Sequence, residues 1–212
     1  MTISAWAPLK ADRTKQLLDI LHVSHMWEIA PGVQFASTEL LKADLHPAHR
    51  LQLARQYGLL DWIEIPIRML LGAPLERYYT EESQDTLDFK LYMVIATNKE
   101  SIAKARKVLA NHPPFPADTD NTPFCPQHAA CKKVWIEKWF LTLGRRIHHP
   151  SEHFPLIFIP DALNNMDHRG MNPECKKYIL EWIDINFSHL IRKEEDLIQE
   201  AVATVRGMFS MD

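Results

Sequence analysis

The residues best suited to chemistry lie in one short stretch, Cys125-Pro-Gln-His128-Ala-Ala-Cys131, where possible metal ligands recur every three residues. The chain has only three cysteines, and the third, Cys175, follows Asn172-Pro-Glu near the start of another expected helix. Thiolate sulfur and imidazole nitrogen suit zinc, and a structural zinc site takes four such ligands in a tetrahedron. One interpretation is therefore a structural zinc ion held by Cys125, Cys131 and Cys175, with His128 as the fourth ligand.

The same three cysteines have a second interpretation. Cysteine is often a small buried apolar residue, so Cys131 and Cys175 fit a helical core and Cys125 fits a loop thiol. The paired C-x-x-C spacing that is typical of zinc sites is incomplete in this chain. Under both interpretations we expect the three sulfurs to meet where the helix after Gln127 and the helix after Asn172 begin.

A second group of polar residues lies between His148 and His168. Histidine is frequent in the chain, with 11 residues, and this segment also carries His149 and His153. One interpretation is the metal centre of a hydrolase or nuclease. The other is helix-end chemistry, because cationic side chains favour the C-terminal end of a helix. We favour the second, since no fixed metal motif such as H-E-x-x-H occurs.

Composition narrows the classes of protein. The 212 residues suffice for one domain, or for two small ones that share a core. A net charge of -3 gives no electrostatic signature of nucleic acid or anionic membrane binding. No apolar run has transmembrane length, no signal peptide is recognisable, and three cysteines make a poor disulfide framework. We therefore expect an intracellular protein, in the cytoplasm or the nucleus.

The apolar residues repeat with helical spacing along nearly the whole chain, which predicts an all-α fold. We expect an irregular multi-helix bundle of about eight to ten helices. The Pro-rich stretch 112–126 is expected to be a loop between an N-terminal helical subdomain, 1–111, and a C-terminal one, 127–212. Within these, a polar helix entry is expected at 80–85, a fresh helix start at 97–100, an irregular segment at 148–170, and separate helices at 172–190 and 193–208.

Aromatic residues indicate where the core lies. Trp27, Trp62, Trp135 and Leu53 fall on the apolar sides of their expected helices, so we predict that all four are mostly buried.

Several blocks of the sequence resemble a known family. They are His22-Val-Ser-His-Met-Trp27, Arg50-Leu-Gln-Leu-Ala-Arg-Gln-Tyr57-Gly, Asp61-Trp62-Ile-Glu-Ile-Pro, the stretch 125–150 and Asn172-Pro-Glu-Cys175. Together they are similar to the helical region downstream of the BTB/POZ fold in a group of basidiomycete (mushroom) proteins. The resemblance covers the chain after Lys15, and we expect the BTB fold itself to be absent. Family members often carry C-x-x-C where this chain has Asn172-Pro-Glu-Cys175.

The resemblance implies a role in protein–protein interaction. We accordingly expect a non-enzymatic helical module that binds another protein or self-associates, without nucleic acid or membrane as a partner. Two alternatives stay open at this point: a metal-dependent hydrolase or nuclease that uses the His148–His168 segment, and a zinc-stabilised structural or oligomerising protein.

Overall fold

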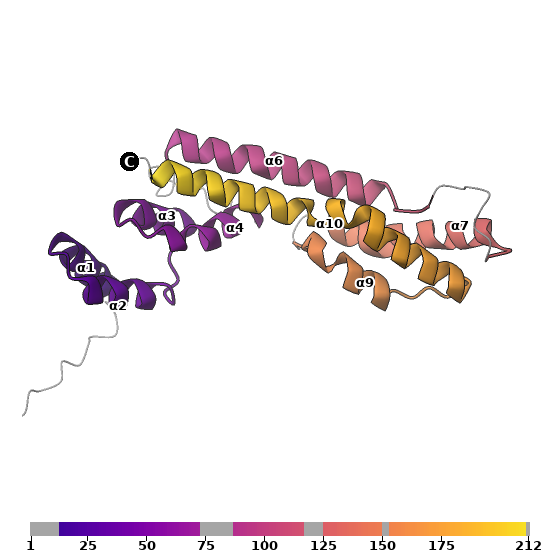
Figure 1. Ribbon diagram of the computed structural model, residues 1–212, viewed down its shortest axis with the longest axis horizontal. Coiled ribbons are helices and arrows are strands. Elements are labelled where there is room, and N and C mark those ends of the chain that lie inside the picture. The colour runs from indigo at the N-terminus through magenta and orange to yellow at the C-terminus, as the bar shows by residue number, and fades with distance from the viewer. Residues whose placement is uncertain (1–12, 73–86, 117–124, 150–152, 211–212) are drawn as a thin grey trace, which may run out of the picture.

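A computed structural model describes residues 13–72, 87–116, 125–149 and 153–210. These residues form helices and no strand, so the prediction of an all-α fold is confirmed. Figure 1 shows an elongated molecule in which α6 (Phe89–Asn111) and α10 (Pro173–Phe209) lie side by side along the long axis. The N-terminal helices occupy one end of this pair, and the helices around α7 occupy the other.

The remaining elements pack around α6 and α10. The N-terminal helices are α1 (Arg13–Met26), α2 (Ala30–Leu40), α3 (Pro47–Gln56) and α4 (Glu64–Gly72), with the 3-10 turn η1 (Leu60–Trp62) before α4. At the other end lie α7 (His128–Trp139), the π-helical turn η3 (Phe140–Gly144), α8 (Arg145–Ile147), the 3-10 turn η4 (Leu156–Phe158) and α9 (Ile159–Asn165). None of the helices in the described ranges is both long and apolar enough to cross a membrane.

Side-chain caps fix the starts of the long helices. The Asp88 carboxylate accepts a hydrogen bond from the backbone N–H of Leu91 at 2.7 Å and so begins α6. The Asn172 side chain accepts from the N–H of Glu174 at 2.9 Å, and Pro173 supplies a first-turn residue that lacks an N–H. The prediction that Asn172 opens a helix is thus confirmed. The polar entry expected at 80–85 lies outside the described residues.

Two predicted helix breaks are wrong. The expected fresh start at Thr97 lies inside α6, where Ile95 and Ile102 continue one buried stripe and the Ser101 hydroxyl donates to the Thr97 carbonyl one turn back. The separate helices expected at 172–190 and 193–208 are one helix, α10. No proline or glycine occurs between residues 174 and 206, so nothing in the local sequence forces a break.

The segment 148–170 is more regular than predicted. It contains η4 and α9, and α9 begins with Pro160 in its first turn. Ile159 and Leu163 of α9 are buried, which ties this short helix to the core and explains why it forms despite its length.

Two apolar cores lie along the molecule, and α6 and α10 contribute to both. The first joins α1 to α4 with Leu91, Ile95 and Ile102 of α6 and with the end of α10 from Leu197 to Val205. The second joins the end of α6 to α7, η3, α9 and the first half of α10. Trp62, Trp135 and Leu53 are buried in these cores, as predicted.

The prediction for Trp27 is wrong, because its side chain is 68% exposed. Helix α1 ends at Met26, and Glu28 adopts a left-handed φ of 55°, so Trp27 lies in the turn that leads to α2. Just beyond this turn the two helices approach closely, since a Cβ on Gly32 would lie 2.9 Å from Ser24 Cβ. Glycine at this position lets α1 and α2 pack as a tight hairpin.

Candidate metal centre

The starts of two helices bring the three cysteines together. Cys125 precedes α7, Cys131 lies in the first turn of α7, and Cys175 lies in the first turn of α10. Their sulfur atoms all lie within 4.8 Å of one another, and the cluster joins residues 50 positions apart in the chain. The predicted convergence of the sulfurs is therefore confirmed. Three soft ligands this close could hold a metal ion.

The individual contacts define the cluster further. Cys125 Sγ lies 3.6 Å from Cys131 Sγ, and Cys175 Sγ lies 3.5 Å from His128 Nδ1. The backbone N–H of Asn172 points to Cys131 Sγ at 3.4 Å. Such an N–H favours a sulfur that carries negative charge, as outer-shell groups around metal ligands commonly do. His128, the fourth residue of the predicted set, contacts Cys175 but is not part of the group whose ligand atoms all lie within 4.8 Å of one another, which is the three cysteines alone.

Burial gives the cluster its electrostatic character. Cys131 and Cys175 are buried members of the second core, whereas Cys125 is only partly buried. Burial, followed by the neighbouring thiols of Cys131 and Cys125, raises the pKa of Cys175 to about 12. Without a nearby cation this thiol therefore keeps its proton at neutral pH. A bound cation would reverse that preference, because it favours the thiolate.

His128 has few partners apart from this cluster. Its ring packs against Phe115 at 5.1 Å between centroids, and its Nε2 is buried without a hydrogen-bond partner among the described residues. A buried ring nitrogen costs free energy unless another group compensates it. Coordination through Nδ1, the nitrogen near Cys175, would give the ring a strong partner at that atom and leave Nε2 as its second nitrogen, unpaired among the described residues.

The histidines of the other predicted segment face different partners. His148 Nε2 lies 3.2 Å from Asn111, and His153 Nε2 lies 3.5 Å from Glu194. His168 is buried, stacked on Trp135 at 5.6 Å, and its Nε2 lies 2.8 Å from the Leu163 carbonyl oxygen. Among the described residues, the three cysteines are the only group of three or more histidine, cysteine or acidic side chains placed to share a metal ion.

Sequence reasoning missed a buried network of polar contacts between the two cores, which we call the polar joint. The Arg106 guanidinium donates to Glu194 at 2.9 Å, to the Phe154 carbonyl at 3.0 Å and to the Ile147 carbonyl at 3.1 Å. The other Glu194 oxygen accepts from the backbone N–H of Leu156 at 2.8 Å. The sequence feature that could have indicated this ion pair is Glu194, a charged residue on the apolar stripe of α10. It lies three residues after Ile191 and three before Leu197.

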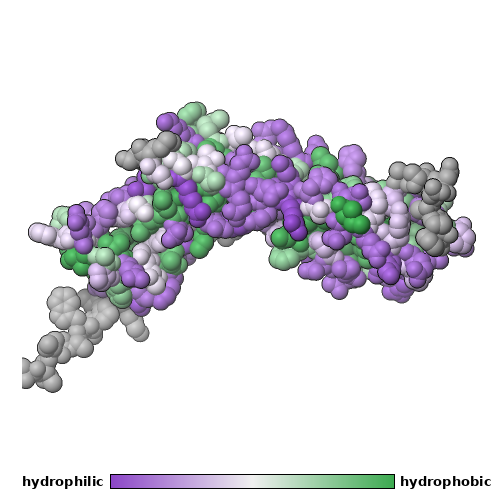
Figure 2. All heavy atoms as spheres, viewed as in Figure 1, coloured by the Kyte–Doolittle hydropathy of each residue, from purple (hydrophilic) through white to green (hydrophobic). Residues whose placement is uncertain are grey.

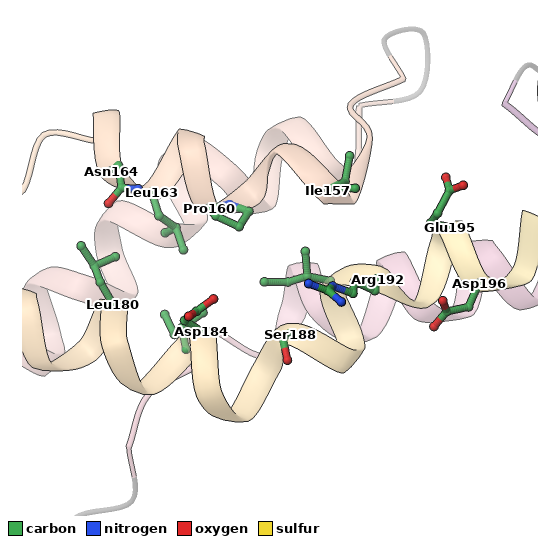
Figure 3. Close-up of a pocket in the computed structure, with 12 residues that line it drawn as sticks. Ile157, Pro160, Leu163, Asn164, Leu180, Asp184, Ser188, Arg192, Glu195 and Asp196 are labelled. Atoms are coloured by element: carbon green, nitrogen blue, oxygen red, sulfur yellow. The ribbon is translucent and has the colours of Figure 1, made fainter.

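A groove beside this joint was not predicted either. It encloses about 400 Å³ between α9 and α10. Figure 3 shows Pro160 and Leu163 on one wall, facing Leu180, Asp184 and Arg192 on the other. The floor is apolar and the rim on α10 is charged, a combination common in ligand sites. No single residue marks such a groove in a sequence, because it depends on how far α9 stands from α10.

No family model, curated protein or solved structure matches this chain.

Proposed function

We propose that this chain is a non-enzymatic helical module that binds another protein and is braced by a structural zinc ion. The observation that carries the interaction role is a second apolar face on the hairpin of α1 and α2. The inward face of α1 holds Leu17 and Leu21, which are buried in the first core. The outward side holds Ile20 and Val23 of α1, which are 39% and 47% exposed, and Trp27 of the turn that follows, which is 68% exposed.

Apolar side chains in the neighbouring turn and helix extend this outward face. Met26, Ile29 and Phe35 are each at least 49% exposed. Apolar green spheres interrupt the hydrophilic surface at the end of the molecule that carries α1 and α2 (Figure 2). Exposed apolar side chains that gather on one part of a soluble protein mark a binding site. A folded protein with an apolar patch of its own is therefore the expected partner.

The resemblance to the helical region of the mushroom BTB/POZ proteins supports the same proposal. The matching blocks include His22 to Trp27, which is the stretch that carries the exposed face. We propose that the chain is related to that family and shares its protein–protein interaction role.

Site-directed photo-crosslinking tests the interaction role. A photoreactive amino acid in place of Trp27 should capture a defined protein in cells, whereas the same group in place of Ile185 should not. Ile185 is a matched control because it is apolar and 76% exposed but lies far along the chain, on α10. The captured protein is then purified and its affinity measured by calorimetry.

Trp27→Ala is expected to weaken that binding by about 30-fold or more, the loss typical of a buried aromatic anchor, with no change for Ile185→Ala. Equal affinity of the Trp27→Ala variant for the purified partner would refute the assignment of this face.

For the metal, we propose zinc bound by Cys125, His128, Cys131 and Cys175. With zinc–sulfur bonds near 2.3 Å, a tetrahedron places two sulfurs about 3.8 Å apart and a sulfur and a nitrogen about 3.6 Å apart. The distances of 3.6 Å between Cys125 and Cys131, and of 3.5 Å between Cys175 and His128, agree with these edges. Four protein ligands would leave no open position, which supports a structural role rather than a catalytic one.

Elemental analysis of the purified, reduced chain tests the zinc proposal. We expect one zinc ion per chain, and loss of most of it in the His128→Ala and Cys175→Ser variants. His189→Ala is the matched control, since His189 is an exposed histidine on α10. Protein grown with ample zinc that contained none would overturn the proposal.

A further inference from the structure

We propose that Cys125 and Cys131 form a dithiol oxidation site, at which a peroxide makes an intramolecular disulfide. The bond itself depends only on the thiol geometry. Its coupling to metal release rests on the zinc proposed above.

All three sulfurs lie within 4.8 Å of one another, so chain position and access single out this pair. The two sulfurs are 3.6 Å apart, and a disulfide bond is about 2.05 Å long, so closure requires a shift of about 1.5 Å. Cys125 lies before the first residue of α7, where the chain is not yet helical, so its approach to Cys131 need not move the helix. Cys175 is held by a different helix, whose start Asn172 caps.

Access also differs among the three thiols. Cys125 is half-buried as a residue, whereas Cys131 and Cys175 retain only 2% and 3% of their accessible surface, and all three sulfurs belong to one buried cluster. An oxidant from solvent therefore meets Cys125 first, and Cys131 is placed to resolve the product. Reactive cysteines in redox-responsive proteins have this arrangement of an accessible thiol beside a resolving one.

The chemistry balances with peroxide as the only oxidant. The Cys125 thiolate attacks one peroxide oxygen, the O–O bond breaks, and the departing hydroxide takes up a proton to form water. The Cys131 thiolate then attacks the Cys125 sulfenic sulfur, the S–S bond forms, and the S–O bond breaks to release a second water after protonation. Two thiolates, one peroxide and two protons thus give one disulfide and two waters, as two electrons pass from sulfur to oxygen.

Closure of this disulfide would remove two of the four proposed zinc ligands. His128 and Cys175 alone cannot fill a tetrahedral site, so the ion is expected to leave as the bond forms. The starts of α7 and α10 would then lose the brace between them, while Cys175 remains a free thiol. The site would convert an oxidising signal into loosening of one end of the molecule.

Peptide mapping with zinc analysis tests the proposal on the full chain. Zinc is first measured in the reduced protein, which then receives one equivalent of hydrogen peroxide. Trypsin cuts after lysine and arginine, so residues 108–132 form one peptide that contains both Cys125 and Cys131, and residues 170–176 form another that contains Cys175. We expect the first peptide to lose two hydrogens and resist alkylation, and zinc to appear in solution in proportion to the disulfide.

Two variants separate the possible outcomes. Cys175→Ser should still form the bridge, whereas Cys125→Ser should not, and circular dichroism verifies that both remain helical. A bridge that joins peptide 170–176 to peptide 108–132, or thiols that all stay open to alkylation, would overturn the proposal. A zinc-free protein that still forms the Cys125–Cys131 bridge would support the oxidation site and refute the zinc site. Bound zinc with unreactive thiols would support the zinc site and refute the oxidation site.

Discussion

The polar joint between the two cores offers the sharpest test of what holds this molecule together. Arg106 and Glu194 retain only 12% and 6% of their side-chain exposure, and their ion pair connects α6 to α10. Glu194→Ala removes the carboxylate that neutralises Arg106 and also the acceptor for the Leu156 N–H. Both donors would stay in a buried region, which is where the loss of a partner is most costly.

The size of the effect follows from that geometry. Removing one member of a buried ion pair typically costs about 3–5 kcal/mol of unfolding free energy. In a chain of this length about 1 kcal/mol shifts the melting temperature by about 2–4 °C, so Glu194→Ala should lower it by about 6–20 °C. Glu194→Gln keeps the size of the side chain and an acceptor for Leu156, so its loss should be smaller.

Urea unfolding, followed by circular dichroism, gives the free energies. The control is Glu100→Ala on α6, because Glu100 pairs with Lys104 at 2.8 Å while both side chains stay more than two-thirds exposed, and no measurable change is expected. The double variant Arg106→Met with Glu194→Leu should recover part of the stability, since an apolar pair of similar volume leaves no buried charge, although the Leu156 N–H still lacks its acceptor. A loss below about 1 kcal/mol in Glu194→Ala would refute the reasoning, because that is the range of exposed pairs.

Three further predictions concern the second core and its metal centre. Trp135→Ala should cost about 3–5 kcal/mol in urea unfolding, because the ring is fully buried, whereas Trp27→Ala should change stability little. Burial lowers the pKa of His168, so the unfolded chain takes up a proton at this histidine before the folded chain does as the pH falls. Its contribution to stability should be complete above about pH 6.5 and decline below it. The His168→Gln variant should show a flatter decline than the His189→Gln control. Chelation of the proposed zinc should speed amide hydrogen exchange in α7 and the first turns of α10 while α3 keeps its protection, and equal exchange with and without chelator would contradict a structural metal.

The cysteine cluster could be predicted because the sequence features that define it are local. Cys125, His128 and Cys131 lie within seven residues, and Asn172 and Pro173 mark the start of the helix that brings in Cys175. Two helix starts and a short ligand spacing were enough to place the three sulfurs together. The all-α class was predictable for a similar reason, since the apolar period repeats within each helix.

The failures arise where long-range packing decides the outcome. Local signals at Thr97 resemble a helix start, but burial of Ile95 and Ile102 on one face of α6 keeps that helix continuous. Trp27 fits an apolar stripe in the sequence, yet the turn after α1 carries it away from the core. Arg106 and Glu194 are 88 positions apart in the chain. The residue pattern within each helix does not indicate which residue of one helix lies opposite which residue of the other.

Helix α10 runs from the proposed metal centre to the first core as one continuous element. Its 37 residues span about 55 Å, with Cys175 in the first turn and Val205 of the first core near the other end. The apolar face on α1 and α2 lies at the N-terminal end of the molecule, whereas α7 and its cysteines lie at the opposite end (Figure 1). Energetic coupling between two sites that far apart requires an element that can switch between two arrangements. The buried Arg106–Glu194 ion pair holds the middle of α10 in a single arrangement. We therefore expect zinc content and partner affinity to vary independently: Trp27→Ala should leave the zinc content unchanged, and Cys125→Ser should leave binding at the hairpin unchanged.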